Sequence, residues 1–382
     1  MTRRSFLRAA AGLGLAAAVG CRRRATQLET DRADMGHDAG EPKGVFRPGE
    51  VWLDTDGKPI QAHGGGVLFD RGTYYWFGEN KDAQTHSGFL RRADVVGINC
   101  YSSTDLYTWK NEGLVLPAAA DDPSHDLHPS RVVERPKVIY NERTGSYVMW
   151  MHIDTSDYQY ARTGVAVAES PAGPYEYRGS FQPNGADSRD MTIFKDDDGA
   201  AYLFHASEWN KTMYIARLSD DYLTVTGEYT RNFVGESREA PAVFRHDGRY
   251  YCITSGCTGW APNPAECAVS DSVMGPWEPQ GNPCVGSAEE VATTFHSQST
   301  FVLPMPRAQR AAASPGNRLQ APVLERQQRQ PSGAAGVAFI LMLDRWNPGN
   351  LGDSRYVWLP IEFDGERPSV RWRDSWDLSV FD

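Results

Sequence analysis

The sequence of 382 residues lacks a hydrophobic run long enough to cross a membrane as a helix. Its most apolar stretch lies within residues 1–21 and is built mainly from alanine and glycine. Positive charge is in deficit, because 39 basic residues face 49 acidic residues and the net charge is −10. This balance argues against nucleic acid as a partner and against a folded domain that binds anionic lipid. The body of the chain shows no long amphipathic pattern, so a helical fold is not expected.

Cysteine is also sparse, and none of the six cysteines forms a Cys-x-x-Cys pair, which weakens the case for a zinc site. Four of them, at positions 252, 257, 267 and 284, lie close together in the sequence. One or two local disulfides are therefore an open possibility in an oxidising compartment, with at least one thiol left free. No cluster of metal-ligating residues stands out, so no cofactor is expected.

The N-terminal residues resemble a targeting signal. Residues 2–8 (TRRSFLR) resemble the twin-arginine export signal, and residues 18–21 (AVGC) resemble a lipoprotein cleavage box. Alanine stands where that box usually has an aliphatic residue, so plain cleavage near Gly20 is the alternative. We expect an exported protein, periplasmic or at the cell surface, that meets the membrane only through a lipid on Cys21. Residues 22–45 are polar and aperiodic, which predicts a flexible tether.

What the chain has in abundance is turn residues, with 36 glycines and 24 prolines. A turn glycine that opens a strand rich in aromatic and β-branched residues occurs five times. These five runs are residues 72–77, 145–150, 199–204, 248–253 and 336–341. A serine-containing turn follows four of the runs, beginning at Ser102, Ser170, Ser219 and Ser270.

Two motifs per repeat describe one four-stranded sheet, and sheets stacked radially form a propeller that protects its strand edges. The sequence therefore predicts an all-β fold, a single five-bladed β-propeller over residues 46–382. Residues 305–335 are rich in arginine, glutamine, proline and alanine, and we expect them to form a loop inserted between strands of the fifth blade.

Polar residues upstream of each glycine–aromatic run are expected to converge, because the first strand of every blade lines the central channel. Each repeat has an acidic or polar group at a similar place upstream of its run. These groups lie in segments 61–66, 134–137, 188–191, 237–241 and 296–300. An acidic residue beside an arginine is usually a surface or structural ion pair. Three acids at equivalent positions, Glu134, Asp190 and Glu239, instead favour a site on the axis.

The ordered strings SRDM at 188–191, REAP at 238–241, SGCTGW at 255–260 and FHSQST at 295–300 resemble glycoside hydrolase family 43, in particular its exo-β-1,3-galactanase branch. The resemblance implies single-displacement hydrolysis with inversion, in which an acid protonates the departing oxygen while a base activates water. Glu239 matches the general acid, which burial and nearby negative charge would keep protonated. Asp190 and Glu134 stand where they would raise the pKa of Glu239 and bind sugar hydroxyls.

The base is where this chain departs from most of the family. Relatives carry an aspartate at the start of the first blade, where this chain has alanine, histidine and glycine at 62–64. The galactanase branch shares this loss, and Gln298 is the substitute that the resemblance implies. A neutral amide is a poor base, so Gln298 would position water or act through an imidic tautomer. Glu79 or Glu134 as a conventional base is the open alternative.

Further substrate contacts are expected from aromatic residues near the mouth of the channel. Trp260 is the predicted stacking platform, with packing between blades as the alternative, and Thr258 and Asn263 are its predicted hydroxyl-binding partners. Glu79 and His63 are also placed among the substrate contacts.

A structural cation such as calcium at the axis, held by His63 or His296, is left open, although a hydrogen-bonded histidine is the favoured interpretation. Residues 344–346 (DRW) are expected to support the fifth blade.

The predicted activity is that of an inverting exo-β-1,3-galactanase, which releases galactose from the β-1,3-galactan of plant arabinogalactan. The expected partner is a galactan or arabinogalactan oligosaccharide. A β-xylosidase or α-L-arabinofuranosidase of the same family is one alternative, and the missing first-blade aspartate argues against it. A non-catalytic sugar-binding propeller is the other, and the presence of Glu239 argues against that.

Overall fold

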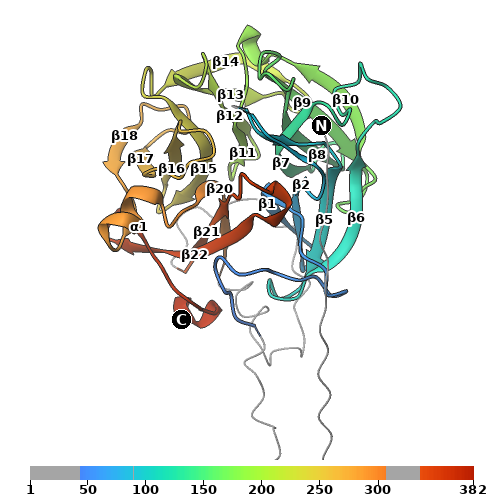
Figure 1. Ribbon diagram of the computed structural model, residues 1–382. Helices are drawn as coiled ribbons and strands as arrows, with labels where there is room; N and C mark the ends of the chain where they lie inside the picture. Colours follow the sequence, from blue (N-terminus) through green and yellow to red (C-terminus); the bar gives the residue numbers. More distant parts are fainter. Residues whose placement is uncertain (1–43, 89, 307–335) are drawn as a thin grey trace, which may run out of the picture. The chain divides into compact units, whose positions relative to one another are not determined.

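The computed structural model describes residues 44–88, 90–306 and 336–382 (Figure 1). These described residues belong to one compact unit, in which strands make up nearly all of the regular structure. The expected export signal with Cys21, nearly all of the tether and residues 307–335 of the expected loop lie outside the described residues. No helix in the described part has the length and apolar character needed to span a bilayer.

Five antiparallel sheets follow one another along the chain. Blade 1 contains β1 (His63–Asp70), β2 (Thr73–Asn80), β5 (Gly97–Ser103) and β6 (Lys110–Pro117). Blade 2 contains β7 (Val132–Asn141), β8 (Ser146–Asp154), β9 (Arg162–Ala168) and β10 (Glu176–Phe181). Blade 3 contains β11 (Met191–Lys195), β12 (Ala201–Ser207), β13 (Thr212–Leu218) and β14 (Val225–Asn232). Blade 4 contains β15 (Arg238–His246), β16 (Arg249–Gly256), β17 (Glu266–Ser270) and β18 (Glu278–Gly281).

The fifth blade has an additional strand. It contains β20 (Gln298–Met305), β21 (Ala338–Arg345), β22 (Arg355–Asp364) and β23 (Arg367–Arg371), and β19 (Cys284–Val285) pairs with β23 in parallel. The remaining elements are the small hairpin β3 (Thr85–His86) and β4 (Arg92–Ala93), helix α1 (Ala288–Thr293), and the 3-10 turns η1 (Pro183–Gly185), η2 (Leu351–Asp353) and η3 (Leu378–Phe381).

The inner strands close a ring. β1 contacts β7, β7 contacts β11, β11 contacts β15, β15 contacts β20, and β20 returns to β1. The sheets radiate from these strands in Figure 1. Phe46, which precedes blade 1, exchanges backbone hydrogen bonds of 2.8 and 3.1 Å with Trp376 near the C-terminus. This arrangement confirms the predicted five-bladed propeller.

Turn glycines begin the second strand of each blade, as the repeat predicted. All five glycines have a positive φ, between +71° at Gly145 and +114° at Gly336, a conformation that side chains with a Cβ rarely adopt. The aromatic residues that follow are buried between blades. Trp76 of blade 1, for example, lies 4.8 Å from Trp358 of blade 5 in an edge-to-face contact between ring centroids.

The described cysteines are all free, so the local disulfides left open by the sequence are not present. Cys252 on β16 and Cys267 on β17 illustrate the reason. Cys252 pairs in register with Ala268, one position away from Cys267. Neighbouring positions along a strand face opposite sides of a sheet, and the two thiols accordingly belong to different core clusters.

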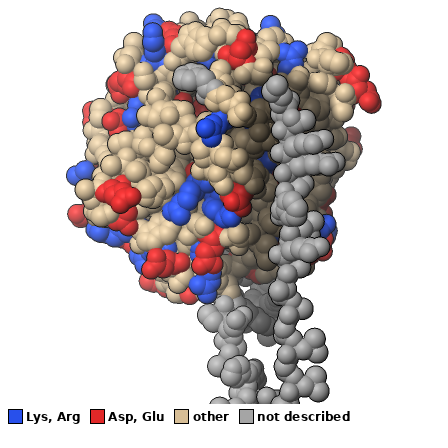
Figure 2. All heavy atoms as spheres, viewed as in Figure 1, with Lys and Arg blue, Asp and Glu red and all other residues tan. Residues whose placement is uncertain are grey.

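Charge is dispersed over the face shown in Figure 2. Acidic and basic side chains of the described residues are interspersed there, and on that face the basic groups form no continuous stripe.

Candidate active site

A bulge interrupts four of the five inner strands near the end that carries the predicted site. The pairing register with the second strand shifts after His63 in β1, Glu134 in β7, Glu239 in β15 and Ser299 in β20. Gly64, Arg135 and Ala240, which follow the first three, all have a left-handed backbone. A bulge bends the strand and redirects the adjacent side chain. The repeated bulge therefore turns the polar residues at these strand ends toward one another.

Arg135 is buried at this end of β7 and connects the predicted residues. Its Nε and Nη2 contact the two carboxyl oxygens of Asp190 at 3.1 and 2.8 Å. Nη2 also donates to Gln298 Oε1 at 2.6 Å, and Nη1 donates to the carbonyl of Ser299 at 3.0 Å. The backbone N–H of Arg135 donates to Glu79 Oε1 at 3.0 Å. The rigid guanidinium fork thus joins blade 2 to the residues at blades 3 and 5, and the backbone N–H of the same residue adds blade 1.

Glu239 lies in this group with both carboxyl oxygens hydrogen-bonded. Oε1 accepts from Gln298 Nε2 at 3.0 Å, and Oε2 accepts from Asn210 Nδ2 at 2.9 Å. Burial, and then the negative charge of Asp190, raise the pKa of Glu239 to about 8, although the charge of Arg135 opposes the shift. A carboxyl with this pKa keeps its proton at neutral pH, which a general acid requires.

Glu134 has the opposite protonation state. Its Oε1 accepts from the Tyr158 hydroxyl at 3.1 Å and lies 3.8 Å from Lys81 Nζ, and its Oε2 lies 3.5 Å from His152 Nδ1. Burial alone would raise the pKa of Glu134. The hydrogen bond from His152 and the charges of Lys81, His152 and Arg135 outweigh burial and lower this pKa to about 2. Glu134 is therefore a carboxylate at neutral pH.

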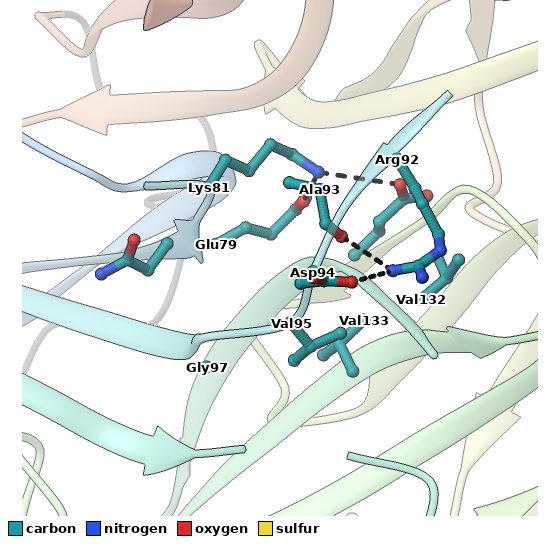
Figure 3. A pocket seen from close by; sticks show the side chains of 11 residues that line it. Glu79, Lys81, Arg92, Ala93, Asp94, Val95, Gly97, Val132 and Val133 are labelled. Atoms are coloured by element: carbon teal, nitrogen blue, oxygen red, sulfur yellow. Dashed lines mark hydrogen bonds and ion pairs between the residues drawn. The ribbon is translucent and has the colours of Figure 1, made fainter. Parts of the chain in front are cut away.

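Glu79 near the end of β2 and Lys81 just beyond this strand form an ion pair, with 2.5 Å between Oε2 and Nζ (Figure 3). Burial raises the pKa of Glu79 to about 7, and the charge of Lys81 opposes the shift. The Glu79 side chain is only 4% exposed, which leaves almost no surface for the sugar contact predicted from the sequence. We therefore assign Glu79 to the support of Lys81 and of the Arg135 backbone.

Three residues of the cluster could together offer ligand atoms to a metal ion. Glu134, His152 and Asp190 offer ligand atoms that lie within 4.8 Å of one another. However, Arg135 already pairs with Asp190, and Lys81 lies close to Glu134. Burial alone would lower the pKa of His152, but its hydrogen bonds to two carboxylates raise it to about 9, so the ring is protonated at neutral pH. The positive charges of Lys81, Arg135 and His152 already balance the two carboxylates. The residues therefore do not fit a metal cation.

Two tryptophans border the site beside Gln298. The rings of Trp260 and Trp346 meet edge to face with 5.3 Å between centroids, and both line a pocket with Gln298. Trp346 Nε1 donates to Gln298 Oε1 at 3.0 Å. Trp260 therefore lies beside the cluster, in the region expected of a stacking platform. Trp346 was expected only to support blade 5, and its hydrogen bond brings it into the site instead.

Thr258 and Asn263 use their polar groups within their own loop. Asn263 Nδ2 donates to Thr258 Oγ1 at 2.7 Å and to the Gly256 carbonyl at 2.9 Å, and its Oδ1 accepts from the Gly256 N–H at 2.7 Å. Thr258 Oγ1 donates to the carbonyl of Ala261 at 2.6 Å. These contacts hold the loop that carries Trp260, and the sugar contacts of Thr258 and Asn263 stay predictions.

The two histidines considered for a cation or a sugar contact lie near the cluster but have other partners. His63 has no exposed surface, stacks on Tyr356 with 4.9 Å between centroids, and has Nδ1 3.5 Å from Asp344. The predicted sugar contact of His63 is therefore not found, because neighbouring side chains cover the ring. His296 is exposed and pairs with Glu289 at 3.2 Å.

Several site residues were not predicted. Lys81, His152, Asn210 and Cys257 all lie at or just beyond the end of the second strand of their blade. That strand is antiparallel to the inner one, so its end lies at the same rim as the inner-strand bulges. A search downstream of each glycine–aromatic run, as well as upstream, would have found these positions.

Comparisons with known proteins agree with this geometry. The model of the family described as "Glycosyl hydrolases family 43" matches residues 65–302. A solved family 43 β-1,3-galactosidase with galactodeoxynojirimycin is 41% identical, with a TM-score of 0.74 over 87% of this chain and 100% of that chain. An exo-β-1,3-galactanase from Phanerochaete chrysosporium, solved with β-1,3-galactotriose, is 36% identical, with a TM-score of 0.73 over 89% of this chain and 70% of that chain.

A curated relative, a β-D-galactofuranosidase from Aspergillus niger, is 27% identical over 213 residues. The match spans 50% of this chain and 59% of that protein. Because the family model covers more than half of the chain, and a protonated carboxyl lies among the acids that the family resemblance singled out, the chain belongs to glycoside hydrolase family 43 and is a glycoside hydrolase.

Proposed function

We propose that the protein is an inverting exo-β-1,3-galactanase that removes galactose from the ends of β-1,3-galactan, such as the backbone of plant arabinogalactan. The observation that carries the proposal is Glu239, a carboxyl held protonated beside Asp190 and Gln298. The similarity to a β-1,3-galactosidase and an exo-β-1,3-galactanase supports the choice of sugar and linkage.

In the proposed reaction Glu239 gives its proton to the glycosidic oxygen, while water attacks the anomeric carbon from the opposite face of the ring. The bond from the anomeric carbon to the glycosidic oxygen breaks, the attacking water loses one proton to solvent as the new C–O bond forms, and Glu239 takes up a proton from solvent before the next cycle. Asp190 contacts Arg135 through both carboxyl oxygens, and its negative charge favours the protonated form of Glu239 until the bond breaks. Positive charge builds up on the sugar ring in the transition state. The Glu134 carboxylate is suited to stabilise that charge, whereas a pKa of about 2 makes it a weak base.

Gln298 takes two successive roles in this proposal. In the free protein its Nε2 donates to Glu239 at 3.0 Å and to Ser255 Oγ at 2.9 Å, so it orients the acid. Acid and water-binding group stand about 6.5–9.5 Å apart in inverting enzymes, because a sugar and a water molecule lie between them. Sugar binding therefore has to open the Gln298–Glu239 contact before the amide can hold the attacking water.

The test is incubation with β-1,3-galactan, followed by ¹H NMR of the first products. We expect free galactose that is initially the α-anomer. Glu239→Gln keeps the shape of the side chain and removes the acid, and should abolish release. Glu236→Gln, at an exposed position in the connection that precedes β15, is the matched control and should retain full activity. A fully active Glu239→Gln protein would exclude Glu239 as the acid, and β-galactose as the first product would exclude inversion.

The same assay separates the alternatives. A panel of nitrophenyl glycosides would identify a β-xylosidase, an α-L-arabinofuranosidase or the galactofuranosidase activity in the name of the Aspergillus niger relative. Oligosaccharide binding without release of any sugar would indicate a non-catalytic propeller.

We also propose that residues 1–21 direct export and that Cys21 carries a lipid, which would place the hydrolase at a membrane surface outside the cytoplasm. The twin-arginine pattern and the Ala-Val-Gly-Cys string support this proposal. Metabolic labelling with a radioactive fatty acid should mark the protein, and Cys21→Ser should abolish the label and release the protein from the membrane fraction. Labelling that survives this substitution would overturn the assignment.

A further inference from the structure

Trp209 stands out among the tryptophans. All 11 lie in the described residues, and only Trp209 exposes more than half of its surface, at 57%. It lies in the turn between β12 and β13, where Glu208, Trp209 and Asn210 have consecutive positive φ values of 54°, 58° and 61°. Three successive non-glycine residues in this conformation are unfavourable and persist only where the surroundings hold them.

Asp187 supplies that restraint. Its Oδ1 accepts from Ser207 Oγ at 2.8 Å and from the Glu208 N–H at 2.7 Å, and its Oδ2 accepts from the Trp209 N–H at 3.1 Å. Arg189 pairs with the same carboxylate, and its guanidinium carbon lies 4.2 Å from the centre of the Trp209 ring. The cation therefore covers part of the indole while more than half of the residue faces solvent.

The turn also contacts the acid. Asn210, the next residue, donates from Nδ2 to Glu239 Oε2 at 2.9 Å. A general acid must reach the glycosidic oxygen, so it lies beside the junction between the sugar that is released and the sugar that departs. Trp209 is one residue from the group that touches this acid and is held in an open position.

We propose that Trp209 is a platform for the leaving-group sugar, that is, the sugar on the far side of the bond being cut. This assignment rests on the proposed function. The ligand class is a pyranose that presents an apolar face of C–H groups, and β-linked galactose does so on the face opposite its axial hydroxyl. An indole fixed by Asp187 and Arg189 loses little conformational entropy when such a face stacks on it.

Trp209 would then act on substrates with a second sugar and not on those without one. The test measures kcat/KM for two substrates, β-1,3-galactobiose and β-galactosyl fluoride, whose fluoride leaving group is too small to reach the indole. For Trp209→Ala we expect a loss of about tenfold or more with galactobiose, and a change of less than about twofold with the fluoride. Trp209→Phe keeps an aromatic face and should recover most of the loss.

Tyr229→Ala removes another exposed aromatic from the same blade, 44% exposed on β14, and should change neither substrate. Retained hydrolysis of the fluoride also shows that the variant is folded. An equal loss with both substrates would overturn the proposal, and so would no loss with galactobiose. Because fluoride departs without a proton from Glu239, a role in orienting that acid would also spare the fluoride. Such a role would instead move the alkaline limb of the pH profile with galactobiose in Trp209→Ala, and that shift would likewise overturn the proposal. Wild-type protein that hydrolysed neither substrate would overturn the proposed function itself, and this assignment with it.

Discussion

Gln298 donates a hydrogen bond from Nε2 to Glu239 Oε1 over 3.0 Å, joining blade 5 to blade 4 beside the axis. The amide oxygen of Gln298 accepts in turn from Arg135 at 2.6 Å and from Trp346 at 3.0 Å. The orientation of the amide follows from these partners, because both donors to Oε1 lack any acceptor atom at the contact. The acid is thus held by a neutral donor, which leaves its proton available for the substrate.

The first prediction concerns pH. Because the pKa of Glu239 is raised to about 8, the acid is protonated below that pH and loses its proton above it. The logarithm of kcat/KM for β-1,3-galactobiose should therefore change little around neutral pH. It should fall as the pH rises through about 8. Asp190→Asn removes the charge that helps to raise this pKa, so the alkaline limb should move to lower pH.

Asp190→Asn is also expected to reduce the maximal rate, and the diagnostic quantity is the position of the limb rather than its height. Glu236→Gln again serves as the control and should leave the profile unchanged. An alkaline limb that stayed in place in Asp190→Asn would show that Asp190 does not act on the acid.

The second prediction concerns Arg135. Replacing it by alanine leaves the Asp190 carboxylate, which is 14% exposed, without its cation and removes a donor from Gln298. Loss of one partner of a buried ion pair typically costs about 3–5 kcal/mol of the free energy of unfolding. Arg135→Lys keeps the charge but loses the fork, and should fall between wild type and alanine. Urea denaturation measures the stability, and galactose release measures the activity.

Arg249 provides the comparison for that experiment. Its guanidinium pairs with Asp271 at 2.9 Å and with Glu366 at 2.7 Å, and both acids are largely exposed. Arg249→Ala should therefore cost less than about 1 kcal/mol and leave activity intact. A similar loss of stability at Arg249 and Arg135 would contradict the central role assigned to Arg135.

The third prediction concerns Cys257, the one exposed thiol among the described cysteines. Its pKa is raised well above the usual value by burial of the sulfur and by the charge of Glu239, so little thiolate is present at neutral pH. Iodoacetamide should inactivate the enzyme slowly at neutral pH and faster at higher pH. Added galactose should slow the inactivation, because the modified sulfur lies beside the acid.

Cys257→Ser is the control for this reaction, since serine keeps a small polar side chain and is not alkylated under these conditions. The variant should remain active and resist the reagent. Inactivation of Cys257→Ser at the wild-type rate would instead implicate one of the buried thiols.

Much of the fold was predictable because each repeat is defined by residues that lie close together in the sequence. A glycine at a positive φ and an aromatic strand identify the second strand of each blade, and residues a fixed distance upstream then share one end of the ring. That logic located Glu134, Asp190 and Glu239 without any knowledge of packing, whereas Gln298 followed from the family resemblance.

The sequence did not reveal those roles that depend on burial or on the direction of a side chain. His63 shares the phase of the site residues, but Tyr356 covers it. Thr258 and Asn263 face their own loop, and Trp346 reaches the site through its hydrogen bond to Gln298. Arg135 lies next to Glu134 in the sequence, and only the left-handed backbone at the bulge sends its side chain to Asp190.

The last prediction concerns stability in acid. His205 on β12 is fully buried next to Tyr214, and burial lowers its pKa from the ordinary value of 6.5 to about 4. The unfolded chain then binds a proton at this site at a higher pH than the folded chain does. The contribution of His205 to stability is complete above pH 6.5 and is lost as the pH falls toward 4, by about 3 kcal/mol in all.

His205→Phe removes the titration, so its free energy of unfolding should fall less steeply than that of wild type between pH 6.5 and 4. His296→Gln, at an exposed histidine, should follow the wild-type slope. Parallel slopes for wild type and His205→Phe would show that the imidazole is not kept neutral by burial.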